Sequence, residues 1–107
     1  MLNKREIQLA RRIGRRIRAL RQERGWGQVD LSAHIDEFLT QPTLSYVENG
    51  SRLSSLRALL RIADAFEIDI AGLFLNPEES RREKILMAVW NCSETTLEHV
   101  AKLVDVE

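Results

Sequence analysis

Apart from arginine, this sequence holds few residues of the types that do chemistry at a site. His34 and His99 lie 65 residues apart, and Cys92 is the single cysteine. Their spacing matches neither a zinc site nor a nucleophile with its base, and there is no Gly-rich phosphate loop. We therefore expect no enzyme, no metal and no cofactor, and two surface histidines. One cysteine cannot form an internal disulfide, which favours a reducing cytoplasm.

Basic side chains gather near the N-terminus. Residues 1–26 carry a net charge of +7, because nine basic residues stand against Glu6 and Glu23. Residues 27–52, 53–77 and 78–107 carry −3, −1 and −3, so the whole chain is neutral. This asymmetry is typical of a surface that binds polyanions. A solvated, Arg-rich helix face would give the same pattern. The nine residues are Lys4, Arg5, Arg11, Arg12, Arg15, Arg16, Arg18, Arg21 and Arg24.

Length and composition bound the architecture. A chain of 107 residues, 44% hydrophobic and 30% charged, predicts one compact domain with a small appendage. No apolar run approaches the roughly 20 residues of a membrane span, and the start lacks the apolar core of a signal peptide. We therefore expect no membrane partner.

Apolar residues recur at helical spacing along the chain, and no alternating stretch predicts a strand. Thr40 with Pro42 is typical of a helix start, and Asn49-Gly50 of a helix end. Thr95 with Glu98 resembles a capping box. The predicted helices are one through Ala10–Leu20 that stops at Gly25–Gly27, then 28–36 (inner face Val29, Leu31, Ser32 and Ile35), 41–49, one capped by Ser54 or Ser55, 70–75 capped by Asp69, 78–91 and 94–105.

Two short adjacent helices inside this run carry a resemblance to a known family. From about Gly14 to Phe74 the chain resembles the Xre family of helix-turn-helix regulators, which includes the phage repressors and Cro. The resemblance rests on the order and spacing of Gly14, Ile17, Leu20-Arg21, Gln28, Leu31, Leu44-Ser45, Val47-Glu48-Asn49-Gly50 and the apolar stripe Leu56, Leu59, Leu60, Ala63 and Phe66. It implies an all-α fold: a five-helix repressor-like domain over residues 1–76, with the helix-turn-helix at about 28–49, and a two-helix extension over 77–107.

The sequence departs from the family pattern at one place. The family's short turn usually contains glycine, whereas Asp36-Glu37-Phe38-Leu39 occupies it here. The interval from Gln28 to Glu48 is about two residues longer than usual. Either the second helix is longer or the turn is an extended loop.

The resemblance implies which side chains meet DNA. The second helix of such a pair enters the major groove, which is about 12 Å wide. Its start and outer face would read bases through Gln41, Pro42, Thr43, Ser45 and Tyr46. Phosphate contacts would come from Gln28, Asn49, Ser51, Arg52, Arg15 and Arg18. Two alternatives stay open: Gln28 as a solvated helix start, and Tyr46 as a packing residue.

Two further residues have a structural role in the family. An arginine near the end of the first helix pairs there with the glutamate before Asn-Gly, which implies that Arg21 pairs with Glu48. The expected core is Trp26, Leu31, Ile35, Leu44, Val47, Leu60, Ala63, Phe66 and Phe74.

The implied function is a sequence-specific transcriptional regulator that binds double-stranded DNA as a homodimer. One such domain reads half a site, so two-fold pairing is the normal solution. We expect the tail to form the dimer interface, because its apolar side chains need cover: Ile85, Leu86, Val89, Trp90, Leu97, Val100 and Val104. The alternative is an antitoxin-like module in which residues 78–107 bind a partner protein.

Overall fold

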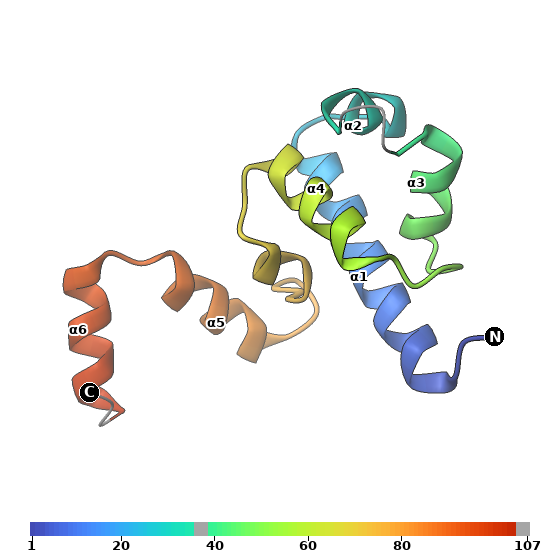
Figure 1. The fold of residues 1–107 in the computed structure, drawn as a ribbon. Coiled ribbons are helices and arrows are strands. Elements are labelled where there is room, and N and C mark those ends of the chain that lie inside the picture. The colour runs from blue at the N-terminus through green and yellow to red at the C-terminus, as the bar shows by residue number, and fades with distance from the viewer. Residues whose placement is uncertain (36–38, 105–107) are drawn as a thin grey trace. The chain divides into compact units, whose positions relative to one another are not determined.

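The structure is a computed structural model that describes residues 1–35 and 39–104 of the chain. Within these residues it is all-helical, which confirms the predicted fold class (Figure 1). The chain divides into two compact units, Met1–Phe74 and Leu75–Glu107. The first holds α1 (Lys4–Glu23), α2 (Gln28–His34), α3 (Gln41–Glu48), α4 (Leu56–Phe66) and the 3-10 turn η2 (Ile70–Leu73). The second holds α5 (Arg81–Asn91) and α6 (Glu94–Leu103).

Short polar side chains set most helix starts, because they accept from backbone N–H groups that lack a partner in the first turn. Asn3 caps α1 by accepting from the N–H of Glu6 at 2.9 Å. Thr40 and Ser55 do the same for α3 and α4. The start of α2 differs, since the N–H of Gly27 donates to the Asp30 carboxylate at 2.7 Å.

Several predicted boundaries are wrong. Helix α2 ends at His34 rather than at residue 36, and the predicted loop residues 36–38 lie outside the described part of the chain. The fifth helix is a 3-10 turn that ends at Leu73. In the tail, α5 begins at Arg81 instead of residue 78, because Ser80 supplies its cap. Ser93, not Thr95, caps α6, which ends at Leu103.

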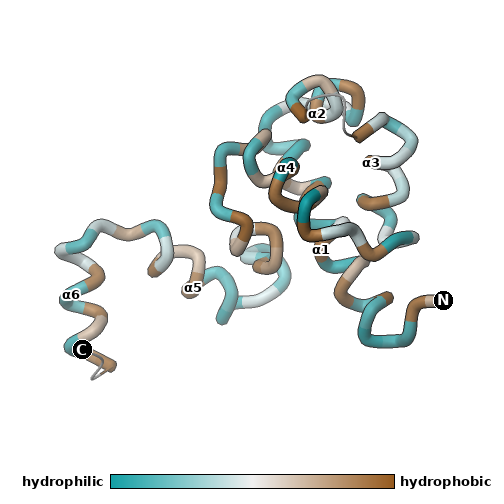
Figure 2. Tube along the Cα trace, in the orientation of Figure 1, coloured by the Kyte–Doolittle hydropathy of each residue, from teal (hydrophilic) through white to brown (hydrophobic). Residues whose placement is uncertain are grey.

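The core of the first unit lies between the inward faces of its helices, where hydrophobic stretches alternate with hydrophilic ones along each helix (Figure 2). Its fully buried large side chains are Ile17, Leu31, Leu44, Ile62 and Leu73. Trp26 is half-buried against this core and stacks on Phe66 with ring centroids 5.9 Å apart.

Four expectations about burial are wrong. Leu60 is 49% exposed and Leu56 71% exposed, because the inward stripe of α4 runs through Leu59, Ile62, Ala63 and Phe66. Val29 lies on the outer side of the short α2. Phe74 is also exposed, since η2 is a single tight turn and Leu73 takes the core position.

The second unit has no comparable core. Helices α5 and α6 contain no buried residue. Ile85, Trp90 and Leu103 are more than half exposed. Several large apolar side chains of the tail are therefore exposed, while others, such as Val89 and Val100, are half-buried.

Candidate nucleic-acid interface

Helix α3 presents one apolar and one polar face. Leu44 and Val47 are buried against the core. Of the five residues expected to read bases, Gln41, Pro42 and Tyr46 are exposed and Thr43 and Ser45 are half-buried. The buried pair fixes how the helix rotates about its axis, so the polar face is directed to solvent.

Glu48, at the last turn of α3, is buried. Its carboxylate accepts from Arg21 Nε at 2.7 Å and from Arg21 Nη2 at 2.8 Å, a two-pronged contact. The structure therefore brings together the two residues expected to pair. Arg21 Nη1 also donates to the carbonyl of Trp26 at 2.8 Å, so one guanidinium joins α1, α3 and the turn after α1.

The electrostatics of this pair favour the ionised forms. Burial raises the pKa of Glu48. The hydrogen bonds from Arg21 and Gln28, the positive charge of Arg21 and a weaker hydrogen bond from Arg18 together outweigh it and hold that pKa below its ordinary value. The hydrogen bond to Glu48 raises the pKa of Arg21. The carboxylate is thus a charged group at neutral pH, buried with its partner.

A glycine lets α1 approach α3 this closely. A Cβ placed on Gly14 would lie 2.6 Å from the carbonyl oxygen of Val47 and would also collide with that of Glu48. Both atoms belong to the backbone of α3 and cannot rotate away. Gly14 and Arg21, two turns apart on α1, therefore hold the end of α3 from two points.

Two glutamines connect α2 to the start of α3. Gln41 Nε2 donates to Gln28 Oε1 at 2.7 Å. Gln28 Nε2 in turn donates to the Glu48 carboxylate at 3.3 Å. Gln28 is half-buried and bonded at both ends of its amide, so the reading as a solvated helix start is wrong. The chain of bonds runs from the buried ion pair to the first side chain of α3.

The segment after α3 folds back on itself. Gly50 adopts φ +75°, a left-handed conformation that ends the helix. The N–H of Ser51 donates to the Asn49 side chain at 2.9 Å. The guanidinium of Arg52 lies 4.7 Å from the centre of the Tyr46 ring. Tyr46 is therefore held by a cation–π contact on the surface and is 46% exposed, not packed in the core.

Comparison with known proteins agrees with this geometry. Residues 12–73 match the family described as helix-turn-helix domain. This chain belongs to the helix-turn-helix domain family. The chain is also 32% identical over 78 residues to the competence pilus inhibition repressor of Acinetobacter baylyi (strain ATCC 33305 / BD413 / ADP1), across 73% of this chain and 69% of that relative.

Part of the N-terminal positive charge is used inside the first unit, where two arginines bind backbone carbonyls. Arg16 is 6% exposed, and its Nε donates to the carbonyl of Gly72 in η2 at 2.9 Å. Arg24 donates to the carbonyls of Leu20 and Phe66 at 3.0 and 2.8 Å. Neither role was predicted from the sequence. The pattern that could have indicated the role of Arg16 is that helical spacing puts it on the same face of α1 as Ile13 and Leu20, which are buried.

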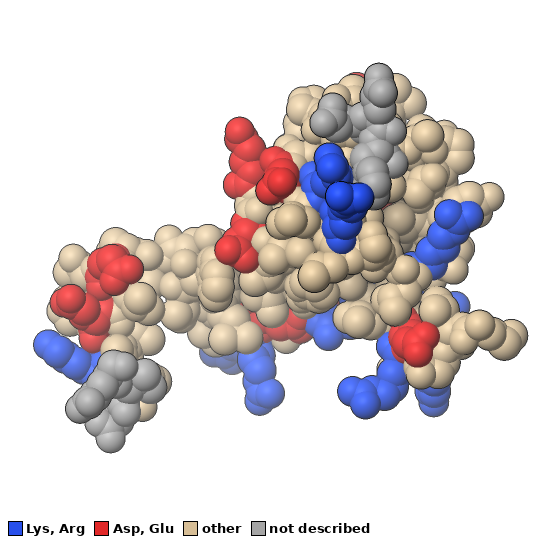
Figure 3. Space-filling model, viewed as in Figure 1, with Lys and Arg blue, Asp and Glu red and all other residues tan. Residues whose placement is uncertain are grey.

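The remaining basic residues of α1 face solvent to different degrees. Arg15 and Arg18 are exposed, although Arg18 Nε also lies 3.5 Å from the Glu48 carboxylate. Basic side chains lie around the end of the first unit that carries the N-terminus (Figure 3). Arg15 and Arg18 are therefore both on the surface, and Arg18 lies beside the end of α3.

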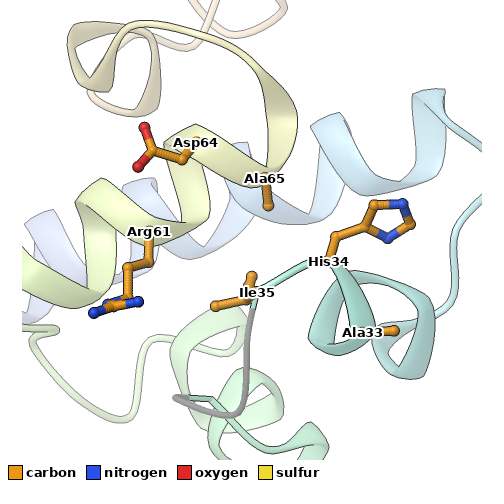
Figure 4. Close-up of a pocket in the computed structure, with 6 residues that line it drawn as sticks. All are labelled: Ala33, His34, Ile35, Arg61, Asp64 and Ala65. Carbon is orange, nitrogen blue, oxygen red and sulfur yellow. The ribbon is translucent and has the colours of Figure 1, made fainter.

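A surface pocket lies away from the polar face of α3, between α2 and α4. It is lined by Ala33, His34, Ile35, Arg61, Asp64 and Ala65. The polar side chains that line it point in different directions (Figure 4). His34 instead stacks on Trp26, with ring centroids 4.1 Å apart. Because its polar groups do not converge, this pocket offers no arrangement for acid–base chemistry.

Within residues 1–35 and 39–104, no cluster of three or more His, Cys, Asp or Glu side chains could hold a metal ion. In the same part of the chain, no helix is both long enough and apolar enough to cross a membrane.

We predict that the Arg21–Glu48 pair makes a cooperative contribution to stability. Arg21→Met should lower the free energy of unfolding by about 3–5 kcal/mol, because it leaves a buried carboxylate without its partner. Adding Glu48→Gln to that variant should restore part of the loss. Urea denaturation of both single variants and the double variant measures the coupling. Strictly additive losses would contradict a direct interaction.

Acid should weaken the same interaction. Because the folded-state pKa of Glu48 is lowered, its contribution is complete above the unfolded-state pKa and disappears as pH falls through the folded-state value. The difference in unfolding free energy between wild type and Glu48→Gln should therefore be largest near neutrality and shrink below about pH 4. Denaturation at several pH values measures it, with the exposed Glu23→Gln as control. A difference that stays constant down to about pH 3 would show that the carboxylate is not the group involved.

Proposed function

We propose that this protein is a sequence-specific, DNA-binding transcriptional regulator of the Xre type, which acts as a homodimer on a two-fold operator. The carrying observation is the polar face of α3, held outward by Leu44 and Val47 and fixed at its end by the buried Arg21–Glu48 pair. Membership of the helix-turn-helix domain family and a relative named as a repressor support this function. They also point to a regulator that is not an enzyme.

Base reading is assigned to the outward residues of α3. An amide such as that of Gln41 pairs in two-pronged fashion with adenine, since it both donates and accepts. Gln28 accepts one Nε2 hydrogen of Gln41 and leaves the second for the base. Gln28 therefore positions Gln41 for its contact with the base. Pro42 offers apolar contact to a thymine methyl, while Thr43, Ser45 and Tyr46 offer hydroxyl groups.

Phosphate binding is assigned to residues that border α3. Asn49, Ser51 and Arg52 follow its C-terminus, and Arg15 and Arg18 stand on the adjacent face of α1. Gln28 begins α2 and is directed toward the same region by its bond to Gln41. Helix α3 itself carries no basic residue. This division fits the general rule that phosphate contacts supply affinity while amides and hydroxyls at base edges supply specificity.

The homodimer is assigned to the tail. A single helix-turn-helix reads half a site, and most soluble homo-oligomers are two-fold dimers. The exposed apolar residues of α5 and α6 suit such an interface, with Trp90 as its aromatic anchor at 61% exposure. The antitoxin-like alternative is not favoured, since the relative is named as a repressor.

Selection of bound duplexes from a random pool tests this function. The full chain at moderate salt should enrich one motif with two-fold symmetry, and its half-sites should lie about one helical turn apart.

Arg15→Ala and Arg18→Ala should each flatten the dependence of log K on log salt by about 0.9 per lost contact. An unenriched pool, or affinity that does not change with salt, would contradict the proposal.

Replacing Gln41 tests the base readout. Gln41→Ala should relax preference at one base position of each half-site and cost about 1–3 kcal/mol there. Gln28→Ala should produce a smaller loss of preference at the same base position, because Gln41 is still present but is no longer held by its hydrogen bond to Gln28. Both are measured by repeating the selection. If the motif from Gln41→Ala equals that of the wild type, Gln41 does not read a base.

Substitution in the tail tests the dimer. Trp90→Asp in the full chain should raise the dimer dissociation constant at least tenfold, since it places a charge in an apolar interface. Lys84→Ala, about 120° around α5 from Trp90 by helical spacing, is the matched control and should change little. Light scattering measures the mass, and truncation after Pro77 should give a monomer. A truncated chain that stays dimeric would exclude the tail as the interface.

A further inference from the structure

Four basic residues share one face of α1, and two of them lie beyond the residues assigned to DNA so far. Successive residues of a helix are separated by 100°, so Lys4, Arg11, Arg15 and Arg18 fall on one stripe. Arg5 lies about a quarter turn away, on the side of Arg12 and Arg16. Arg16 is the residue that donates to η2. The stripe and the structural arginine therefore belong to different sides of α1.

Arg11 is placed directly against the segment that follows α3. A Cβ on Gly50 would lie 2.6 Å from Arg11 Cγ and 2.8 Å from Arg11 Cα. The base of the Arg11 side chain thus packs on the residue between Asn49 and Ser51, two of the assigned phosphate ligands. Arg11 is exposed. The stripe is therefore continuous with the DNA-facing side of the helix-turn-helix.

The first part of α1 carries positive charges, on Lys4, Arg5 and Arg11, that make no fold-stabilising ion pair with any residue that the structure describes. The residues of α1 before Arg12 precede the region that matches the helix-turn-helix domain family. Lys4 and Arg5 stand in the first turn, where the helix dipole disfavours positive charge. Arg11 and Arg15, four residues apart, repel each other on the helix surface. Within the described chain, no acidic side chain forms an ion pair with Lys4 or Arg11.

A polyanion bound along the stripe offsets the costs at Lys4 and Arg11. We infer that Lys4 and Arg11 contact DNA phosphates that flank the base pairs read by α3, which extends the footprint of each subunit. The inference rests on the proposed DNA-binding function. From Arg11 to Lys4 the helix rises about 10 Å, which corresponds to about three base pairs at 3.4 Å each. The additional contacts carry no base specificity and release counterions.

The test uses the full chain and two duplexes that carry the selected motif. One ends at the selected base pairs, and the other continues for about one helical turn, roughly ten base pairs, on each side. Fluorescence anisotropy over a series of salt concentrations gives affinity and salt slope for each. The wild type should bind the longer duplex more tightly and with a steeper slope.

Arg11→Ala is the test variant, and Arg5→Ala removes the same charge from a position about a quarter turn from the stripe around α1. Arg11→Ala should lose most of the advantage of the longer duplex and flatten its slope by about 0.9 per contact. Arg11→Gln, which keeps packing against Gly50, should behave likewise, whereas Arg11→Lys should retain the slope. Arg5→Ala should keep the wild-type preference for the longer duplex.

The outcomes separate this inference from the function on which it rests. If the wild type binds the motif but Arg11→Ala and Arg5→Ala show the same slopes and length preference, the flanking contact is wrong and the regulator remains. If the wild type binds no duplex, both fail. Unchanged thermal midpoints for the variants would exclude unfolding as the cause of a loss.

Discussion

A carboxylate is buried at the C-terminal end of α3, where the helix dipole is unfavourable to negative charge. Glu48 is stable there because Arg21 meets both of its oxygens and because the pair is ionised together. Removing either charge alone leaves the other without its partner. The orientation of α3 against α1 depends on this contact, and Gly14 allows the approach that it requires. From the same carboxylate, hydrogen bonds lead through Gln28 to Gln41. One hydrogen-bonded network therefore both stabilises the fold and positions Gln41, the first residue on the polar face of α3.

The arginines in and just after α1 include two groups that look alike in sequence. Arg16, Arg21 and Arg24 bind carbonyl or carboxylate oxygens inside the first unit. Arg11, Arg15 and Arg18 are exposed; Arg11 packs on Gly50 after α3, and Arg18 lies near the Glu48 carboxylate. The net charge of the N-terminal segment thus overstates what is left for a polyanion. Position on the helix, rather than charge alone, decides which arginines face solvent.

Local signals in the sequence predicted most helices, because caps and stops act within a few residues. Thr40, Asn49 and Gly50 bound α3 as expected. The errors about burial arise where tertiary packing determines which of two similar adjacent residues is buried. Leu59 and Leu60 are equally apolar, yet only Leu59 faces the core. The contact between Gln28 and Gln41 spans 13 residues and was not predicted. The Arg21–Glu48 pair was expected through family resemblance, since no local pattern links two residues that far apart.

The proposed function requires that the polar face of α3 and the residues that border it contact DNA. Chemical-shift mapping of backbone amides during titration of the full chain with the selected duplex measures this contact. We expect the largest shifts at Gln28, along α3 from Gln41 to Tyr46, and at residues 49–52, with small shifts around the pocket lined by Ala33 and Arg61. Largest shifts at that pocket or along α5 and α6, with α3 unaffected, would contradict it.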